Sequence, residues 1–307
     1  MTRLPEKFET SISQKLGSDL PAFIESLNES PPVSIRINPH KNKRPAPADP
    51  IPWCPFGQYL PQRPVFTLDP LFHAGSYYVQ EASSMFLGEA LRQSTDLRLP
   101  LRVLDLCAAP GGKSTHILSL IGTESLLVSN EVIRSRASIL SENIQKWGYP
   151  NAIVTNNEAS DFQQLKGFFD VIVIDAPCSG EGLFRKDPNA INEWSPDDVQ
   201  RCSARQKRIV TDVWAALREN GILIYCTCTY NESENEDNLK WLKENYSLDF
   251  IRLRTETSWG ITEVETNGLF AYRFFPHKTR GEGFFLSVMR KTESCATKNM
   301  KSKKLRN

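Results

Sequence analysis

The sequence predicts an α/β fold with a largely parallel sheet. From residue 101 onward, short apolar runs alternate with segments in which apolar residues recur at helical spacing. This alternation is typical of βαβ units, in which each helix returns the chain to the same end of a parallel sheet. The expected strands are 101–107, 125–131, 151–157, 170–177, 221–230 and 284–291, and the expected helices are 115–121, 134–148, 196–220 and 232–246.

Proline interrupts regular structure in the first hundred residues, where residues 30–56 read "SPPVSIRINPHKNKRPAPADPIPWCPF". A short helix at 20–27 and a strand at 33–38 are expected around this stretch. From Ser76 the chain is expected to turn into a helix with Met85, Leu87 and Leu91 on one side. The predicted organisation is an N-terminal RNA-recognition region (1–95), a main domain (96–292) and a basic tail (293–307) that is expected to be disordered.

Composition is that of a globular protein, with 40% hydrophobic and 24% charged residues and a net charge of +1. The first residues, "MTRLPEKFET", show no signal peptide, and no window approaches the roughly 18 apolar residues of a membrane helix. Seven cysteines without a secretion signal indicate a reducing compartment. We therefore expect a cytoplasmic chain with no membrane partner, and a monomer as the default state.

The segment "LDLCAAPGGKST" (104–115) looks like part of a phosphate-binding loop, but Cys107 stands where that motif has its first glycine. Asp105 lies inside the first strand, and Glu131 ends the second, about 20 positions after the glycines. Carboxylates there suit ribose hydroxyls and would repel phosphates. The loop therefore favours S-adenosylmethionine over a nucleoside triphosphate or a dinucleotide, and a tight turn without a ligand is the remaining alternative.

Three cysteines lie at the ends of two expected strands: Cys178 after the fourth, and Cys226 and Cys228 in the fifth. They could be buried structural thiols, zinc ligands or nucleophiles. Zinc is disfavoured because only a C-x-C spacing is present. A thiolate beside a methyl donor fits cytosine, whose carbon 5 becomes nucleophilic only after a thiolate adds to carbon 6. Asp175 could assist at the ring nitrogens, and a second cysteine could serve the release step.

The segments "LDLCAAPGGKSTHI", "DAPCSGEGLFRKDP" and "YCTCTYNESENE", with "NE" at 130–131, resemble the RNA cytosine-5 methyltransferases of the NOL1/NOP2/Sun family. The flanking segments "PPVSIRIN", "SYYVQEASSM" and "FPHKTRGEGFFLSVMRK" are similar to its bacterial members, so the resemblance covers about residues 30–291. It implies a Rossmann-like class I methyltransferase sheet with helices on both faces, preceded by a smaller α+β N-terminal region.

The resemblance also implies site residues. Cys228 corresponds to the family nucleophile, Cys178 to the cysteine involved in release, Asp175 to the junction between cofactor and cytosine, and Glu131 to the ribose contact. Lys113 is expected to help set the polar network of the cofactor and the active site. The residues implied to bind S-adenosylmethionine in the loop are Cys107, Ala108, Ala109, Pro110, Gly111, Gly112 and Lys113.

Two positions depart from the family pattern. The usual aspartate after the third strand, which contacts the adenosine, is replaced in "TNNEASD", where we assign Glu158, with Asn157 second. Position 226 is usually serine and is cysteine here. Because alternation places Cys226 and Cys228 on the same face, residue chemistry alone does not choose between them.

The implied partner is RNA, with small-subunit ribosomal RNA slightly favoured over transfer RNA, and no metal. A non-catalytic RNA-binding or ribosome assembly factor on the same fold is the alternative, although both cysteines and Asp175 argue against it. Longer relatives carry a C-terminal RNA-binding module that is not found in this sequence. Recognition is therefore expected to depend on the N-terminal region, the basic segment 201–208, the basic stretch 298–306 or a partner.

Overall fold

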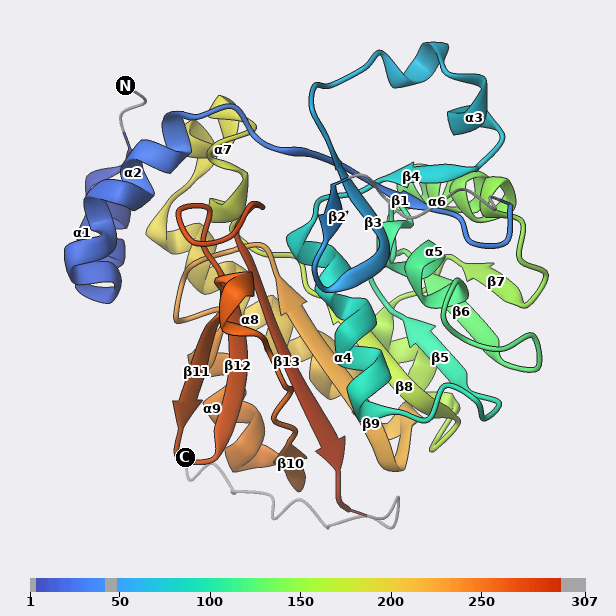
Figure 1. Cartoon of the computed structure of the whole chain (residues 1–307). Coiled ribbons are helices and arrows are strands. Elements are labelled where there is room, and N and C mark those ends of the chain that lie inside the picture. Colours follow the sequence, from blue (N-terminus) through green and yellow to red (C-terminus); the bar gives the residue numbers. More distant parts are fainter. Residues whose placement is uncertain (1–3, 42–48, 294–307) are drawn as a thin grey trace, which may run out of the picture.

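The computed structural model describes residues 4–41 and 49–293, so all but the first residue of the expected tail (293–307), including its basic stretch, lies outside the described residues. Within this part the chain forms a nine-stranded and a four-stranded sheet (Figure 1). The large sheet has the order β11 (Thr262–Thr266), β12 (Leu269–Phe274), β13 (Phe284–Lys291), β9 (Leu217–Thr227), β8 (Phe169–Asp175), β5 (Arg102–Asp105), β6 (Leu126–Asn130) and β7 (Ala152–Thr155), and β10 (Leu248–Phe250) pairs with β13.

The five strands β7, β6, β5, β8 and β9 of the large sheet are parallel, and β13, β12, β11 and β10 extend it in antiparallel fashion. The small sheet is antiparallel, in the order β2 (Pro50–Ile51), β3 (Cys54–Leu60), β1 (Val33–Ile37) and β4 (Tyr77–Val79). The helices are α1 (Glu6–Leu16), α2 (Leu20–Asn28), α3 (Pro70–His73), α4 (Leu87–Ser94), α5 (Gly112–Leu118), α6 (Arg134–Trp147), α7 (Pro188–Glu193), α8 (Pro196–Val213) and α9 (Glu236–Asn245).

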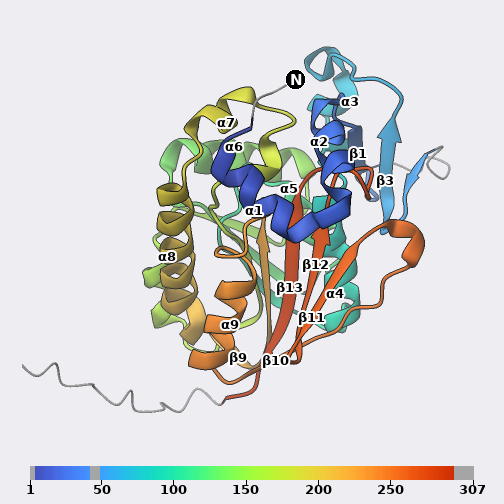
Figure 2. The same ribbon diagram turned by 90° about the vertical axis from the view of Figure 1, so that its left-hand side faces the viewer.

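Helices cover both faces of the large sheet. Alternate residues of β5 belong to two different apolar clusters: Val103 packs with residues of α4, α5 and α6, and Leu104 packs with residues of α8 and α9. Figure 2 shows α8 and α9 on one side of the sheet and α4 on the other. The predicted Rossmann-like sheet with helices on both faces is therefore confirmed. No helix in residues 4–41 or 49–293 is long and apolar enough to cross a membrane.

One predicted element is wrong at its end. The sequence favours a continuous helix at 196–220, but α8 ends at Val213 and a short 3-10 turn leads into β9. Leu217 already pairs with Phe169 of β8, and both side chains are buried. Helical spacing of the apolar residues is thus overridden by strand pairing. The helix expected at 232–246 also begins later, at Glu236, which leaves 228–235 as a loop at the strand end.

The N-terminal helices lie over one end of the large sheet, next to α7 (Figure 1). The ring of Phe8 in α1 packs edge-to-face on Phe184, with centroids 5.0 Å apart. The ring of Phe23 in α2 packs in the same way on Tyr230, at 5.1 Å. The contacted aromatic residues belong to the segments that follow Cys178 and Cys228. The first two helices therefore cover the segments that carry the candidate thiols.

A buried arginine joins the small sheet to the helix that follows the glycine loop. Arg36 of β1 is fully buried; its Nη2 donates to Thr115 Oγ1 (2.6 Å) and its Nε donates to Gln80 Oε1 (2.8 Å). Its guanidinium lies over the ring of Trp147, 4.5 Å from the centroid. Burial lowers the pKa of Arg36 to about 10, so the side chain is still charged at neutral pH.

We expect Arg36→Met to lower the free energy of unfolding by about 2–4 kcal/mol, because the buried partners Gln80 and Thr115 lose a charged donor. Urea unfolding followed by circular dichroism measures this change. Arg98→Met is the control, since Arg98 pairs with Asp96 on the surface and exposed pairs of this kind contribute little to the free energy of unfolding. Equal effects of the two substitutions would contradict a structural role for Arg36.

Candidate active site

The candidate site lies at the edge where the parallel strands end. Asp105 ends β5 and pairs in register with Val173 of β8, while Asp175 at the end of β8 pairs with Cys226 of β9. Ligands of open parallel sheets bind beyond this carboxyl edge. The structure thus brings the predicted loop, acids and thiols to one edge.

The glycine loop (residues 106–112) is held by its neighbours. The backbone N–H of Ala108 donates to the carbonyl of Asn130 (2.8 Å), and Arg136 Nη2 donates to the carbonyl of Ala109 (2.9 Å). The partner groups outside the loop belong to Asn130 of β6 and Arg136 of α6, and both elements follow the loop in sequence. The loop is therefore fixed at both its strand side and its helix side.

The backbone conformation of the loop accounts for the glycine at position 111. Its φ of +113° lies in a region that favours glycine, and a Cβ at this position would lie 3.2 Å from Leu140 Cδ1 of α6. Any other residue would strain the backbone and press on α6. Helix α5 begins immediately after this position.

Asp105 is a buried carboxyl with an unused acceptor. Its Oδ2 accepts a hydrogen bond from Ser114 Oγ (2.6 Å), while Oδ1 has no hydrogen-bond partner among the residues that the structure describes. Burial raises the pKa of Asp105 to about 7; Asp175 and Glu131 add to this rise, and Ser114 and Lys113 oppose it. A buried acceptor without a partner at the ligand edge suits an ammonium or N–H group of a bound molecule.

Glu131 lies directly after β6, as expected. Its Oε1 accepts from the backbone N–H of Ile133 (2.9 Å), and its Oε2 lies 3.3 Å from Arg136 Nη1. The side chain is largely buried, with 3% exposed. These contacts hold the carboxylate at the edge of the sheet.

Glu158 lies in an exposed segment after β7, and its assignment to the adenosine stays a prediction. Asp161 Oδ2 accepts both the backbone N–H of Glu158 and the side-chain amide of Asn157, each at 3.1 Å. The backbone N–H of Asn157 donates to Asn130 Oδ1 (3.0 Å), which ties the segment to the end of β6. The amide of Asn157 is thus engaged with Asp161.

Lys113 and Asp175 form an ion pair of 2.7 Å between Lys113 Nζ and Asp175 Oδ2. Burial lowers the pKa of Lys113, but the negative groups around it, Asp175 first, outweigh burial and raise it above its ordinary value. This lysine therefore points to a carboxylate of β8. The pair links the glycine loop to the strand end that precedes Cys178.

The thiols of Cys178 and Cys228 meet. Their sulfur atoms are 3.1 Å apart, and both residues are partly exposed. The backbone N–H of Gly182 donates to the carbonyl of Cys228 (2.8 Å), and a Cβ at Gly182 would lie 2.6 Å from that oxygen. Contact with Cys228, together with burial, raises the pKa of Cys178 well above its ordinary value. Cys178 is therefore protonated at neutral pH.

The surroundings of Cys226 and Cys107 differ from those of the Cys178–Cys228 pair. Cys226 is fully buried in the apolar cluster that contains Val171 and Ile224, and burial raises the pKa of its thiol well above the ordinary value. Burial also raises the pKa of Cys107. Because β9 ends at Thr227, Cys228 lies outside the strand. The alternation of side chains that would place positions 226 and 228 on the same face therefore does not extend to Cys228. The structure thus favours Cys228 as the accessible thiol.

Sequence reasoning missed a group of polar residues behind the thiols. Ser179, Glu181, Gln206 and Glu234 form hydrogen bonds around the segments that carry Cys178 and Cys228. Glu181 and Glu234 belong to the sequence motifs that contain Cys178 and Cys228. The acidic residues close to these cysteines were therefore the signal that could have identified the group. In residues 4–41 and 49–293, no group of three His, Cys, Asp or Glu side chains could hold a metal ion.

Residues 96–290 match the family described as 16S rRNA methyltransferase RsmB/F. The chain belongs to this family. Residues 4–82 match the N-terminal domain of 16S rRNA methyltransferase RsmF. The family resemblance seen in the sequence motifs is therefore confirmed, and the RsmB/F match covers every predicted site residue.

Curated relatives of this RsmB/F member carry the name ribosomal RNA small subunit methyltransferase F. One from Escherichia coli O157:H7 is 36% identical over 310 residues, covering 94% of this chain and 64% of the relative. Another, from Escherichia coli O7:K1, is 39% identical over 253 residues, covering 80% and 52%. The chain therefore spans about half to two thirds of the length of these curated relatives.

Two solved structures share the fold of this chain. A methyltransferase homolog protein from Pyrococcus horikoshii superposes with a TM-score of 0.77 at 26% identity, covering 94% of this chain and 95% of that one. NSun6 from Pyrococcus horikoshii, solved with SFG, gives a TM-score of 0.79 at 19% identity, covering 94% and 99%. The second likeness concerns the fold alone.

Proposed function

We propose that this chain is an S-adenosylmethionine-dependent RNA methyltransferase that forms 5-methylcytosine in small-subunit ribosomal RNA. One observation carries the proposal: Cys178 Sγ lies 3.1 Å from Cys228 Sγ, on the strand end where Asp175 pairs with Lys113 of the glycine loop. Two thiols and an acid beside a nucleoside loop are what methylation of cytosine carbon 5 requires. Binding of RNA alone requires none of them.

The residues at the sheet edge fit S-adenosylmethionine. In the proposal the loop from Cys107 to Lys113 encloses the ligand, Glu131 accepts from the ribose hydroxyls, and Asp105 Oδ1, which has no partner among the described residues, accepts from the ammonium group. Glu158 remains our assignment for the adenosine, with Asn157 second. When bound, the ligand supplies the methyl group that carbon 5 of the cytosine receives.

The chain's own groups act on the cytosine. The thiol of Cys228 adds to the ring: Sγ bonds to carbon 6, the C5=C6 double bond shifts to C4=C5, and the thiol proton goes to N3. The Asp175 carboxylate favours this addition by accepting hydrogen bonds from N3–H and N4–H. Once carbon 5 is methylated and its proton has left to a base, the bond between Cys228 Sγ and carbon 6 breaks and the ring becomes aromatic again. Cys178, in contact with Cys228, assists this release. The target base must be unpaired or flipped out for the sulfur to reach carbon 6.

A basic cavity supports an RNA substrate. A cavity of about 1110 Å³ lies between the small sheet and the segments that follow Cys178 and β12. Its lining includes four exposed cationic side chains, which suit a phosphate backbone, beside the acidic Glu29 and Glu81; they are Arg63, Lys186, Lys278 and Arg280. In the proposal, RNA binds in this cavity beside the N-terminal region. Arg201, Arg205 and Arg208 are exposed on α8 and are a second candidate surface.

Bisulfite sequencing of total RNA tests the proposal in a strain from which the gene is deleted. We expect one cytosine of small-subunit ribosomal RNA to lose its protection from conversion, and the gene on a plasmid to restore it. Loss of protection in a transfer RNA instead would move the same chemistry to the alternative substrate. Unchanged protection of every RNA, together with a ribosome assembly defect, would favour the non-catalytic alternative.

A further inference from the structure

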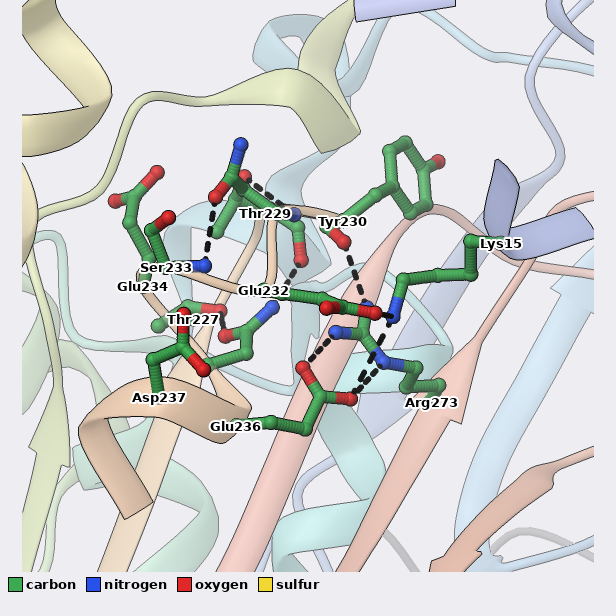
Figure 3. A network of polar contacts seen from close by, with 12 residues as sticks. Lys15, Thr227, Thr229, Tyr230, Glu232, Ser233, Glu234, Glu236, Asp237 and Arg273 are labelled. Atoms are coloured by element: carbon green, nitrogen blue, oxygen red, sulfur yellow. Dashed lines mark hydrogen bonds and ion pairs between the residues drawn. The ribbon is translucent and has the colours of Figure 1, made fainter. Parts of the chain in front are cut away.

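A buried glutamate lies behind the thiol pair. Glu234, in the loop after Cys228, is fully buried. Its Oε2 accepts from the backbone N–H of Ser179 (3.0 Å) and from Gln206 Nε2 (2.8 Å), and its Oε1 accepts from Ser179 Oγ. Figure 3 shows Glu232 and Glu236 turned toward Lys15 and Arg273, with Glu234 turned to the other side. Glu234 is thus the glutamate of this loop that faces the Cys178 segment.

Both chain neighbours of Cys178 are held by this arrangement. Gln206 Nε2, which donates to Glu234, also donates to the carbonyl of Pro177 (2.9 Å). Ser179 is held through its backbone N–H and its hydroxyl. The main chain on each side of Cys178 is therefore fixed by groups that converge on one carboxyl.

The side chain of Gln206 is itself held in place by hydrogen bonds. Its Oε1 accepts from Asn238 Nδ2 (2.6 Å) and from the hydroxyl of Tyr225 (3.0 Å). All the residues that hold Glu234 and Gln206 are buried or partly buried, so water does not readily replace a lost hydrogen bond. A change at Glu234 is therefore transmitted to the Cys178 segment.

The charge of Glu234 is supported by hydrogen bonds and not by a cation. Among the residues that the structure describes, Glu234 forms no salt bridge. The titratable groups around it are Cys178, Cys202 of α8, Tyr225 of β9 and Glu181. Burial raises the pKa of Glu234 to about 7, Glu181 adds to the rise, and the donors Ser179 and Gln206 oppose it.

We propose that Glu234 is a positioning residue whose ionised carboxylate holds residues 177–179, and with them Cys178 against Cys228. Each of its three partners is a donor, so a carboxylate accepts all three, whereas a protonated carboxyl brings a hydrogen toward a donor. The Ser179 hydroxyl can then turn to Thr229 Oγ1, 3.1 Å away, and its bond to Glu234 reverses. Protonation therefore replaces charge-assisted hydrogen bonds with weaker neutral ones, which loosens the hold on the segment. Its catalytic consequence rests on the proposed function.

The first test is amide hydrogen exchange of the peptide that contains Ser179, followed by mass spectrometry between pH 5.5 and 8.5. Glu234→Gln keeps the shape and removes the charge at every pH. We expect about tenfold faster exchange than in the unchanged protein at pH 8, with the two rates converging below pH 6. Equal rates at pH 8 would overturn the proposal.

Glu232→Gln is the matched control. Glu232 lies in the same loop, exposes 60% of its side chain and bonds Lys15 Nζ at 2.6 Å, away from the thiols. We expect its exchange to follow the unchanged protein at every pH. If Glu234→Gln does not fold, Ser179→Ala replaces it. Loss of one donor to the carboxylate should move the pH at which exchange slows upward by about one unit, and an unmoved profile would overturn the proposal.

Activity gives a second, separate readout. On target RNA at pH 8, Glu234→Gln should lower kcat about tenfold with little change in KM, and covalent protein–RNA adduct should accumulate because release depends on Cys178. An unchanged kcat beside altered exchange would overturn the catalytic part. If the unchanged protein itself methylates no RNA, the proposed function fails, while the exchange result still decides the role of Glu234.

The sign of the stability effect follows from the raised pKa. Because the folded pKa of Glu234 lies above its ordinary value, the stability gained from the bound proton is fully present below about pH 4.5 and is lost as the pH rises through about 7. Glu234→Gln should therefore flatten this part of the melting-temperature profile, whereas Glu232→Gln should leave it unchanged. If the melting-temperature profile of Glu234→Gln ran parallel to that of the unchanged protein, the Glu234 carboxyl would not titrate in this range.

Discussion

Cys228→Ala is expected to lower the rate of 5-methylcytosine formation at least about a thousandfold, because the proposal assigns the bond to carbon 6 to the Cys228 thiol. The affinity for S-adenosylmethionine should change by less than about twofold. The sulfur of Cys228 contacts Cys178, and the glycine loop is held by β6 and α6 instead. Transfer of a labelled methyl group to RNA and calorimetric titration of the cofactor measure the two quantities.

Cys226→Ala is the matched control for this substitution. Cys226 lies two residues earlier, inside β9, and is fully buried among apolar side chains. We expect it to keep most of the activity, with a modest loss of stability from the missing sulfur atom. If Cys226→Ala removed methylation and Cys228→Ala kept it, the nucleophile would be Cys226 and the proposed geometry would be wrong.

The parallel part of the sheet and the positions of the candidate site could be predicted because they depend on local sequence. Strands such as β6 (Leu126–Asn130) and turns such as Gly111 carry their own pattern, and parallel topology then gathers the strand ends at one edge. Cys178, Cys228 and Asp175 were predicted to lie at one edge for this reason, whereas the choice of Cys228 over Cys226 came from the family resemblance. Their contact distance still required the structure.

Long-range contacts were not visible in the sequence. In the sequence, Arg36 is a polar residue in a short strand and gives no sign of its surroundings. In the structure it is buried and bonds to Thr115, 79 positions later. The break between α8 and β9 was missed because Leu217 continues the helical spacing while its partner, Phe169, lies in another strand. Glu234 belonged to an expected helix, and only the loop that replaces the first turn lets its carboxyl reach Ser179.

Cys178→Ala is expected to separate addition from release. Cys228 remains able to add to carbon 6, so RNA should become attached to the protein, while release of methylated RNA should slow by about 10² or more, the contribution typical of a lost acid–base group. The adduct would appear as a slowly migrating band on denaturing gels, and nuclease treatment should return it to the position of the free protein.

The double substitution Cys178→Ala with Cys228→Ala decides what such a band means. If Cys228 forms the covalent bond, the double variant gives no adduct, although it still binds RNA. An adduct in the double variant would assign the bond to another cysteine. No adduct from Cys178→Ala alone, with methylation lost, would place Cys178 before the addition step. The 3.1 Å contact would then serve to hold the proton beside Cys228 as its sulfur attacks, and the release role would have to belong to another group at the same edge.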